Sequence, residues 1–382
     1  MAGQLEKALL AARDYASSRL FNRFGVSFKS EQALNRLCQT YQRGKICLFT
    51  GAGVSFTKAK YYQTPGWWDL LMEVYGRIHP ELQETEISSS FEKLKEMYSR
   101  PWRMATFLER ELGNVRMTDT LCEVLYRRTK EKDQKYRPIG GDKKGSRLPT
   151  SYLHHAATLN AVIAFCSSLR AIRVHPCLVP NVKARAVLTL NYDCFLEAGA
   201  TKKYNAYPFK PTALKESGET PSQLPVYHVH GYIPYGMGRR PKYPLVLTEK
   251  SYREAYKPDD FPRKKLDDLL SRFSTLFIGI SFDDELLLRR LEALAAQGGT
   301  SRHFALIKQG GPDRLLDRLT AARVFPILYA CYEQIPSILG HVYKVGLPTD
   351  PRVQIESEGK GKVREAQISP DEYWELLLFN KP

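Results

Sequence analysis

A short apolar run that stops in a glycine turn limits the fold of this chain more than any other feature of its sequence. Residues 45–55 read K-I-C-L-F-T-G-A-G-V-S, and the run 46–49 is typical of a strand buried on both faces. Gly51 and Gly53 lack side chains, which allows a tight turn and a close approach of the backbone to a ligand. A strand, a glycine turn and a helix start form the arrangement by which α/β proteins bind a pyrophosphate. Phe56 replaces the third glycine of G-x-G-x-x-G, so an ordinary strand-to-helix turn stays open at this point.

Strand and helix patterns alternate in the second half of the chain. The apolar runs that predict further strands are 184–190, 225–229, 244–247, 275–280, 303–307 and 324–328. Between about 66 and 180, apolar residues recur at helical spacing and no strand pattern appears. Strands that alternate with helices of this length indicate a parallel sheet covered on both faces.

These patterns predict an α/β fold with a Rossmann-like parallel sheet of about six strands, helices on both faces and a helical insertion subdomain. We expect the following parts: N-terminal helices at 1–40, a core made of 41–65 and 181–345, the insertion at 66–180, and a tail at 346–382. The insertion separates the first strand of the core from all the others.

Composition narrows the functional class. No apolar run approaches the 18–20 or so residues that a membrane span needs, and the seven cysteines include no C-x-x-C pair. We therefore expect a cytoplasmic protein with neither a disulfide framework nor a metal site. The net charge of +16 would suit a nucleic acid, a membrane surface or a polyanionic small molecule. Much of it lies in the basic segment 127–147, whose interleaved glycines favour a solvated loop, and no nucleic-acid-binding motif accompanies it.

Polar residues and glycines follow four of the predicted strands. They are Gly51-Ala52-Gly53 with Ser55, Asn191 with Asp193, His230 before Gly231, and Gly279 with Ser281. In an open parallel sheet, ligands bind outside the carboxyl ends of the strands, where these groups would converge. Each group has an ordinary explanation: helix caps for Asn191, Asp193 and Ser281, and a satisfied core histidine for His230. Four such groups at one sheet edge favour a binding site over four separate coincidences.

The same residues carry a resemblance to a known family. G-A-G-V-S, T-L-N-Y-D, H-V-H-G and G-I-S, in this order, resemble the motifs of the sirtuin NAD-binding fold, over roughly 41–65 and 181–300. The resemblance implies that NAD is bound as the substrate. Gly51, Ala52, Gly53 and Ser55 would then cradle its pyrophosphate, and Gly279 and Ser281 would contact the adenosine half. Asn191 and Asp193 would lie beside nicotinamide and its ribose, and His230 would be catalytic.

Two departures point to one branch of that family. The chain lacks the paired C-x-x-C motifs of the structural zinc in deacylating sirtuins, and 232–240 does not resemble their peptide-clamping strand. The helical insertion with its W-W-D-L-L start is instead similar to the sirtuin-like NAD hydrolases of bacterial antiphage defence. That likeness, closest to the HerA-partnered kind, implies an NADase gated by assembly with a HerA-type translocase ATPase. A homo-oligomer of closed symmetry is the general expectation.

The chemistry of such a site follows from the reaction. Cleavage of the nicotinamide–ribose bond develops positive charge on the ribose, so the protein must grip the diphosphate, orient the ribose and place a nucleophile. Asn191 would hold a water or a ribose hydroxyl, and His230, titrating near neutrality, would be the base. Asp193 would hold the loop or bind nicotinamide.

Alternatives stay open beside this hydrolase. One is an NAD-dependent protein-lysine deacylase, since some sirtuins lack the zinc cysteines. Another is a non-catalytic scaffold that binds NAD or ADP-ribose. A direct nucleic-acid-binding role would rest on charge alone.

Overall fold

The computed structural model describes only part of the chain. The described residues are 28–44, 46–55, 65–126, 156–166, 184–204, 209–213, 224–234, 241, 243–257, 261–282, 284–298, 302–345, 352–356 and 363–367. The basic segment 127–147 and most of the predicted N-terminal helices lie outside these ranges. No helix within them is both long enough and apolar enough to cross a membrane.

Seven strands form one sheet in the order β3-β4-β2-β1-β5-β6-β7. Their bounds are β1 Ile46–Thr50, β2 Val187–Thr189, β3 Phe209–Ala213, β4 Leu224–His228, β5 Ser274–Ile278, β6 His303–Lys308 and β7 Val324–Tyr329. The pairs β1–β2, β2–β4, β3–β4, β5–β6 and β6–β7 are all parallel. Every residue of β1 is buried, as its unbroken apolar run predicts. The predicted α/β fold with a Rossmann-like parallel sheet is therefore confirmed.

Two strand predictions differ from the structure. The expected strand at 244–247 is wrong, because these residues run as an irregular segment into the helix α11 (Glu249–Ala255). The strand β3 was not predicted, because its sequence F-K-P-T-A contains a proline. Proline is tolerated here since β3 lies at one edge of the sheet, where the missing backbone N–H breaks no ladder between two neighbours.

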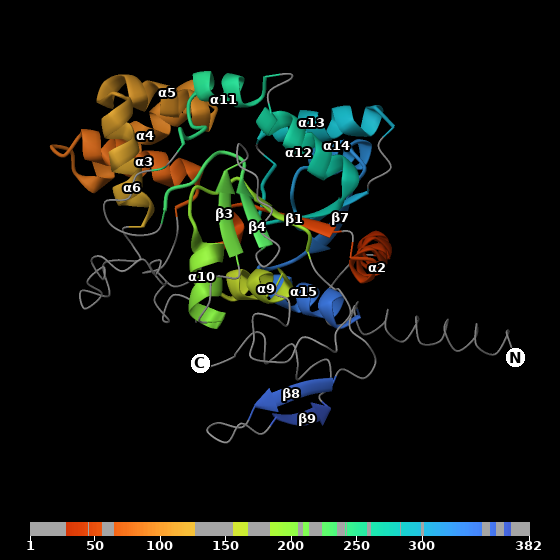
Figure 1. Ribbon diagram of the computed structural model, residues 1–382. Helices are drawn as coiled ribbons and strands as arrows, with labels where there is room; N and C mark the ends of the chain where they lie inside the picture. Colours follow the sequence, from red (N-terminus) through yellow and green to blue (C-terminus); the bar gives the residue numbers. More distant parts are fainter. Residues whose placement is uncertain are drawn as a thin grey trace, which may run out of the picture. The chain divides into compact units, whose positions relative to one another are not determined.

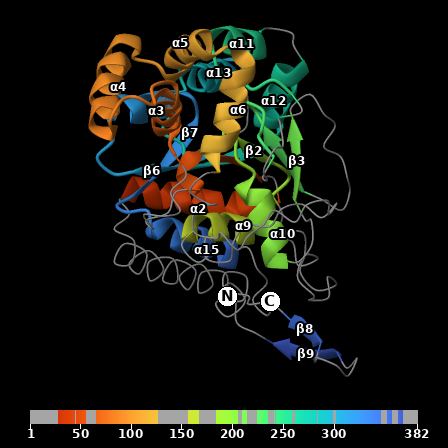
Figure 2. The same ribbon diagram turned by 90° about the vertical axis from the view of Figure 1, so that its left-hand side faces the viewer.

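The chain divides into two compact units, and each is described by itself. One contains β5–β7 with helices on two faces (Figure 1). Its helices are α2 (Phe28–Gln42), α13 (Glu285–Ala296), α14 (Asp313–Ala321) and α15 (Gln334–Val345). Figure 1 places α13 and α14 on one side of β7 and α2 and α15 on the other, and Figure 2 agrees for α13, α2 and α15. Arg318 joins α14 to α13 through ion pairs of 2.9 Å with Glu285 and 2.7 Å with Glu292.

The other unit contains β2–β4 and a group of packed helices. These helices are α3 (Trp67–Ile78), α4 (Glu84–Tyr98), α5 (Pro101–Leu112) and α6 (Asn114–Leu125), with α10 (Phe195–Tyr204), α11 and most of α12 (Phe261–Arg272). The helices α3–α6 contact one another, and α11 packs on α5 (Figure 1). No strand occurs among the described residues 65–126 and 156–166, as the helical spacing predicts.

Two further elements complete the described chain. The helix α9 (Ala157–Cys166) is mostly apolar, and its residues from Ala161 to Cys166 are all buried. In the tail, β8 (Arg352–Glu356) pairs antiparallel with β9 (Val363–Gln367) as a separate two-stranded sheet. These two strands were not predicted from the sequence, because the tail around them is polar and charged, although R-V-Q-I-E of β8 alternates polar and apolar residues.

Candidate functional site

The glycine turn begins where β1 ends. Thr50 is the last residue of β1, and Ala52–Val54 form a single 3₁₀ turn called η1. Gly51 has φ −122° and ψ −173°, an extended conformation that any residue adopts. The backbone conformation therefore does not require glycine at position 51. The predicted reason for glycine at Gly51 stays a close approach of a ligand to the backbone. Ala52 is exposed, whereas Ser55 is buried with 1 % of its surface accessible.

Asn191 and Asp193 lie against this turn, as predicted for two neighbouring strand ends. The Asn191 amide nitrogen Nδ2 donates to the Gly51 carbonyl at 3.3 Å and lies 3.5 Å from the Ser55 hydroxyl. That hydroxyl lies 3.3 Å from Asp193 Oδ1 and donates to the carboxylate. The Asn191 backbone N–H donates to Thr189 Oγ1 at 3.1 Å. Asn191 Oδ1 has no hydrogen-bond partner among the described residues and the side chain is half-buried, so this oxygen can accept from a ligand.

The carboxylate of Asp193 holds the loop between β2 and α10. Its Oδ1 accepts from the Phe195 N–H at 3.1 Å, which satisfies a donor at the start of α10. Burial raises the pKa of Asp193 to about 6, although the Phe195 N–H, the nearby His228 and the Ser55 hydroxyl lower it. A charged form of the Asp193 carboxyl group is therefore available near neutral pH.

His230 lies two residues beyond β4 in an aromatic surrounding. Its Nε2 lies 3.1 Å from the Tyr256 hydroxyl and its Nδ1 lies 3.5 Å from the Tyr252 hydroxyl. The Tyr252 ring packs edge-on to the imidazole with a centroid distance of 4.9 Å, and Trp67 stacks on Tyr252 at 5.7 Å. Gly231 follows with φ +80°, a left-handed conformation that favours glycine and turns the chain away from the strand.

The expectation that His230 titrates near neutrality is wrong. Burial lowers its pKa to about 3, and the imidazole is 2 % exposed. His230 is therefore a neutral ring at physiological pH, which can accept a hydrogen bond or, transiently, a proton. A proton that it accepts would leave readily, because burial disfavours the imidazolium.

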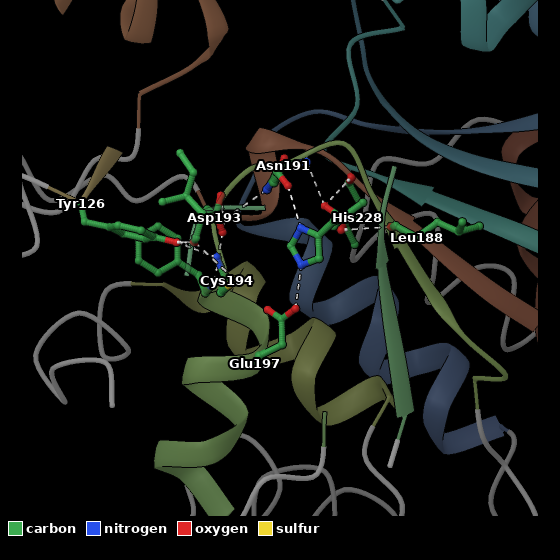
Figure 3. Close-up of polar contacts among 12 residues, drawn as sticks. Tyr126, Leu188, Asn191, Asp193, Cys194, Glu197 and His228 are labelled. Atoms are coloured by element: carbon green, nitrogen blue, oxygen red, sulfur yellow. Dashed lines mark hydrogen bonds and ion pairs between the residues drawn. The ribbon is translucent and has the colours of Figure 1, made fainter. Parts of the chain in front are cut away.

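Sequence reasoning missed His228, which is the last residue of β4 and stands two residues before His230 of the H-G motif. His228 is paired in register with Thr189 of β2, and its imidazole lies between Asn191 and Glu197 (Figure 3). The repeated histidine in H-V-H-G was the available signal, but its partner Glu197 is on another element. Tyr252 and Tyr256, on and just after α11, were missed for the same reason.

Gly279 and Ser281 belong to the other compact unit. Gly279 follows β5 with φ +67°, where glycine is favoured, and Ser281 is exposed. Asp284, rather than Ser281, caps α13, since its Oδ1 accepts from the N–H groups of Leu286 and Leu287. Contact of Gly279 and Ser281 with the adenosine half of NAD stays a prediction.

One group of buried side chains has the donor atoms of a metal site. Cys194, Glu197 and His228 bring one such atom each to within 4.8 Å of one another. However, His228 Nε2 and Glu197 Oε1 are separated by 2.8 Å. Two ligands on one tetrahedral zinc lie about 3.3 Å apart, given bonds of roughly 2.0–2.1 Å. The spacing is that of a hydrogen-bonded ion pair.

Comparison with known families agrees with this geometry. Residues 185–327 match the family described as SIR2-like domain. This part of the chain is a SIR2-like domain. It includes Asn191, Asp193, His230, Gly279 and Ser281, whereas the glycine turn at 51–55 precedes the matched residues. A search of curated proteins gave no match. The SIR2-like domain implies NAD binding, which agrees with the resemblance found in the sequence.

Proposed function

We propose that this chain is an NAD+ glycohydrolase, which cleaves NAD+ with water to give ADP-ribose, nicotinamide and a proton. The observation that carries the proposal is the contact of the Asn191–Asp193 loop with the glycine turn. Asn191 donates through Nδ2 to Gly51, which leaves its Oδ1 as the acceptor available to a ligand. Because a sirtuin-type NAD site combines these parts with the histidine of the H-G motif, the same residues would bind NAD here.

The proposed reaction needs few proton transfers. The nicotinamide–ribose bond breaks with its electron pair going to the pyridinium nitrogen, so nicotinamide leaves as a neutral molecule. Asn191 Oδ1 accepts a hydrogen bond from the attacking water or a ribose hydroxyl, and neutral His230 accepts from the other. The proton released from water passes to solvent, since the low pKa of His230 prevents the imidazole from keeping it. The Asp193 carboxylate favours the positive charge that develops on the ribose.

The wider setting belongs to the same proposal. The likeness to antiphage NAD hydrolases supports a defence effector that depletes NAD, assembles as a homo-oligomer and is gated by a HerA-type ATPase in the cytoplasm. We also propose that the insertion 66–180 separates the two parts of the NAD-binding core, 41–65 and 181–345. The N-terminal helices 1–40 and the tail 346–382 would then be available for assembly.

The test is nicotinamide release from NAD+ by the purified chain, alone and with a candidate ATPase. Release without an acylated peptide is expected, and His230→Ala and Asn191→Ala should each lower it about 100-fold or more. A matched control is His303→Gln, since His303 is a buried histidine of β6 whose Nδ1 accepts from the Thr275 N–H. Full turnover in His230→Ala would contradict the proposal. Release that requires an acyl-lysine peptide would establish a deacylase, and NAD binding without any release would establish a scaffold.

A further inference from the structure

The imidazole of His228 lies between two oxygen atoms of the β2–α10 region. Nδ1 is 2.9 Å from the Asn191 backbone carbonyl, and Nε2 is 2.8 Å from Glu197 Oε1. Figure 3 shows the ring with Asn191 on one side and Glu197 on the other. The side chains of His228 and Glu197 are 0 % and 7 % exposed, so water does not compete for these contacts.

The position of the protons follows from the acceptors. A carbonyl oxygen can only accept, so Nδ1 must carry a hydrogen. A second proton then lies between Nε2 and Glu197 Oε1, either as imidazolium with carboxylate or as imidazole with carboxylic acid. Burial lowers the pKa of His228, but the charge and hydrogen bond of Glu197 and the Asn191 carbonyl outweigh it and raise the pKa overall. The charged pair is the favoured form.

Burying a charged pair of this kind contributes little to the stability of a fold, because both groups lose their hydration. Glu197 Oε2 is buried and has no hydrogen-bond partner among the described residues, so the carboxylate depends on its contact with His228. Glu197 lies in the first turn of α10, where the helix dipole favours its charge only modestly. Buried ion pairs are often no more stable than apolar side chains of the same volume, whereas they fix orientation well. The structure shows what this pair orients, namely the peptide that follows Asn191.

We propose that His228 and Glu197 form a positioning pair that holds Asn191 with its Oδ1 free to meet the NAD ribose. This inference rests on the proposed function. Asn191 is fixed by Thr189 Oγ1 at its N–H, by His228 at its carbonyl, and by Gly51 and Ser55 at Nδ2. His228 provides the contact at the carbonyl, and Glu197 fixes the tautomer and rotation of the ring. Neither residue touches the substrate.

Two substitutions separate charge from position. His228→Leu removes the donor to the Asn191 carbonyl, so kcat should fall about 100-fold while KM for NAD changes by less than about threefold. Glu197→Gln removes the charge, but its amide N–H can donate to Nε2 while Nδ1–H still donates to Asn191. We expect Glu197→Gln to keep at least about a third of kcat, which would show that position, rather than charge, is required.

A double-mutant cycle tests whether His228 acts through Asn191. In an Asn191→Ala background, His228→Leu should cost less than about threefold in kcat, because the side chain that it positions is absent. A merely structural role would lower kcat by the same factor in both backgrounds, and it would overturn the proposal. Near-normal kcat in His228→Leu alone would also overturn it.

Two measurements keep this inference separate from the proposed function. In ¹⁵N-histidine spectra, both ring nitrogens of His228 should be protonated near pH 7.5 in the wild type and only one in Glu197→Gln, whether or not NAD is hydrolysed. Absence of NAD turnover with these spectra would contradict only the function. Cys194→Ser should retain turnover, and metal analysis of the purified protein should find no stoichiometric ion. A stoichiometric metal ion that is lost in Cys194→Ser would overturn the proposal, because it would show that these residues form a metal site.

Discussion

The Ser55 hydroxyl lies 3.3 Å from Oδ1 of Asp193, although 138 residues separate the two in the chain. Ser55 belongs to the glycine turn after β1, and Asp193 belongs to the loop after β2. The hydroxyl has one proton, which it donates to the carboxylate while its oxygen faces Asn191 Nδ2. One small side chain therefore fixes the relative position of the two loops that form the candidate site.

Ser55→Ala should weaken both stability and turnover. The substitution removes a donor from the buried Asp193 carboxylate, so we expect a loss of about 1–2 kcal/mol in the free energy of unfolding. NAD hydrolysis should fall about 10-fold, because the two loops lose their shared contact. Urea unfolding and nicotinamide release measure the two effects. Thr320→Ala is the matched control, since its exposed hydroxyl only donates to Leu316 O of the same helix. Equal losses in both variants would contradict the prediction.

Asp193→Asn should stabilise the protein while it abolishes turnover. The pKa of Asp193 is raised from 3.8 to about 6, so the folded state holds this proton more tightly than the unfolded chain. The protonated Asp193 therefore stabilises the folded state fully below the unfolded pKa of 3.8, and this stabilisation is lost as pH rises through about 6. The free energy lost is about 3 kcal/mol. Asparagine is neutral at every pH, so the variant does not lose this stabilisation, and its side-chain oxygen can still accept from the Phe195 N–H. Unfolding should therefore show a gain near pH 7.5 and none near pH 4. A gain of equal size at both pH values would contradict the assignment.

Tyr256→Phe should lower turnover more than Tyr252→Phe. The Tyr256 hydroxyl lies 3.1 Å from His230 Nε2, whereas the Tyr252 hydroxyl lies 3.5 Å from Nδ1, at the limit of a hydrogen bond. Loss of the closer contact frees the ring to rotate, so we expect a fall of about 10-fold in kcat for Tyr256→Phe and of less than about threefold for Tyr252→Phe. Steady-state kinetics decide, and the reverse order would show that Nδ1 is the nitrogen that needs support.

Gly231→Ala should destabilise the protein through a clash as well as through backbone strain. Gly231 has φ +80°, and an added Cβ would lie 3.2 Å from Leu245 Cδ2 and 3.3 Å from the Pro244 carbonyl. We expect a loss of about 2–3 kcal/mol in the free energy of unfolding. Gly310→Ala is the control, since φ is +84° and an added Cβ would meet nothing within 4 Å. It should cost only the strain, about 1 kcal/mol, and equal thermal shifts in the two variants would exclude the clash.

Arg318→Ala should destabilise the contact between α13 and α14 without changing turnover. Hydrogen bonding to Arg318 lowers the pKa of Glu285 from 4.5 to about 2. The stabilisation is therefore present above pH 4.5 and is lost as pH falls toward 2. Since these side chains are about one-third exposed, the effect should be only about 1 kcal/mol. Unfolding of the variant and the wild type should converge in acid, and a difference that grows in acid would contradict this origin.

Most of the fold could be predicted because local patterns specify it. The helices α3–α6 lie in the segment where apolar residues recur at helical spacing, and β1 follows directly from its apolar run. Edge strands carry a weaker sequence signal, because one of their sides pairs with no other strand. Polar residues and proline are therefore tolerated in them. That is why β3 was missed, whereas the apolar residues 244–247 suggested a strand where the chain instead passes beside His230 and Tyr192, through bonds to Val246.

The candidate site was only partly predictable, for a different physical reason. Glycine, asparagine and histidine at strand ends can be found from sequence because the ends of parallel strands meet at one edge. The contact of His228 with Glu197 needs the register of β4 against β2 and the position of α10 after its cap, which no local pattern contains. The pKa of His230 was mistaken because it depends on burial by Tyr252 and Trp67, which come from distant segments.

The order of synthesis gives the separation between Ser55 and Asp193 a further consequence. The glycine turn leaves the ribosome early, but the β2–α10 loop that contacts it leaves much later. Tyr256, which contacts His230, leaves later still. Closing such long loops lowers the chain entropy before any stabilising contact forms, so these loops should come together late in folding. A nascent chain that ends before Tyr256 lacks part of the surroundings of His230. If the completed site destroys NAD, unfinished chains would be harmless to the cell that makes them.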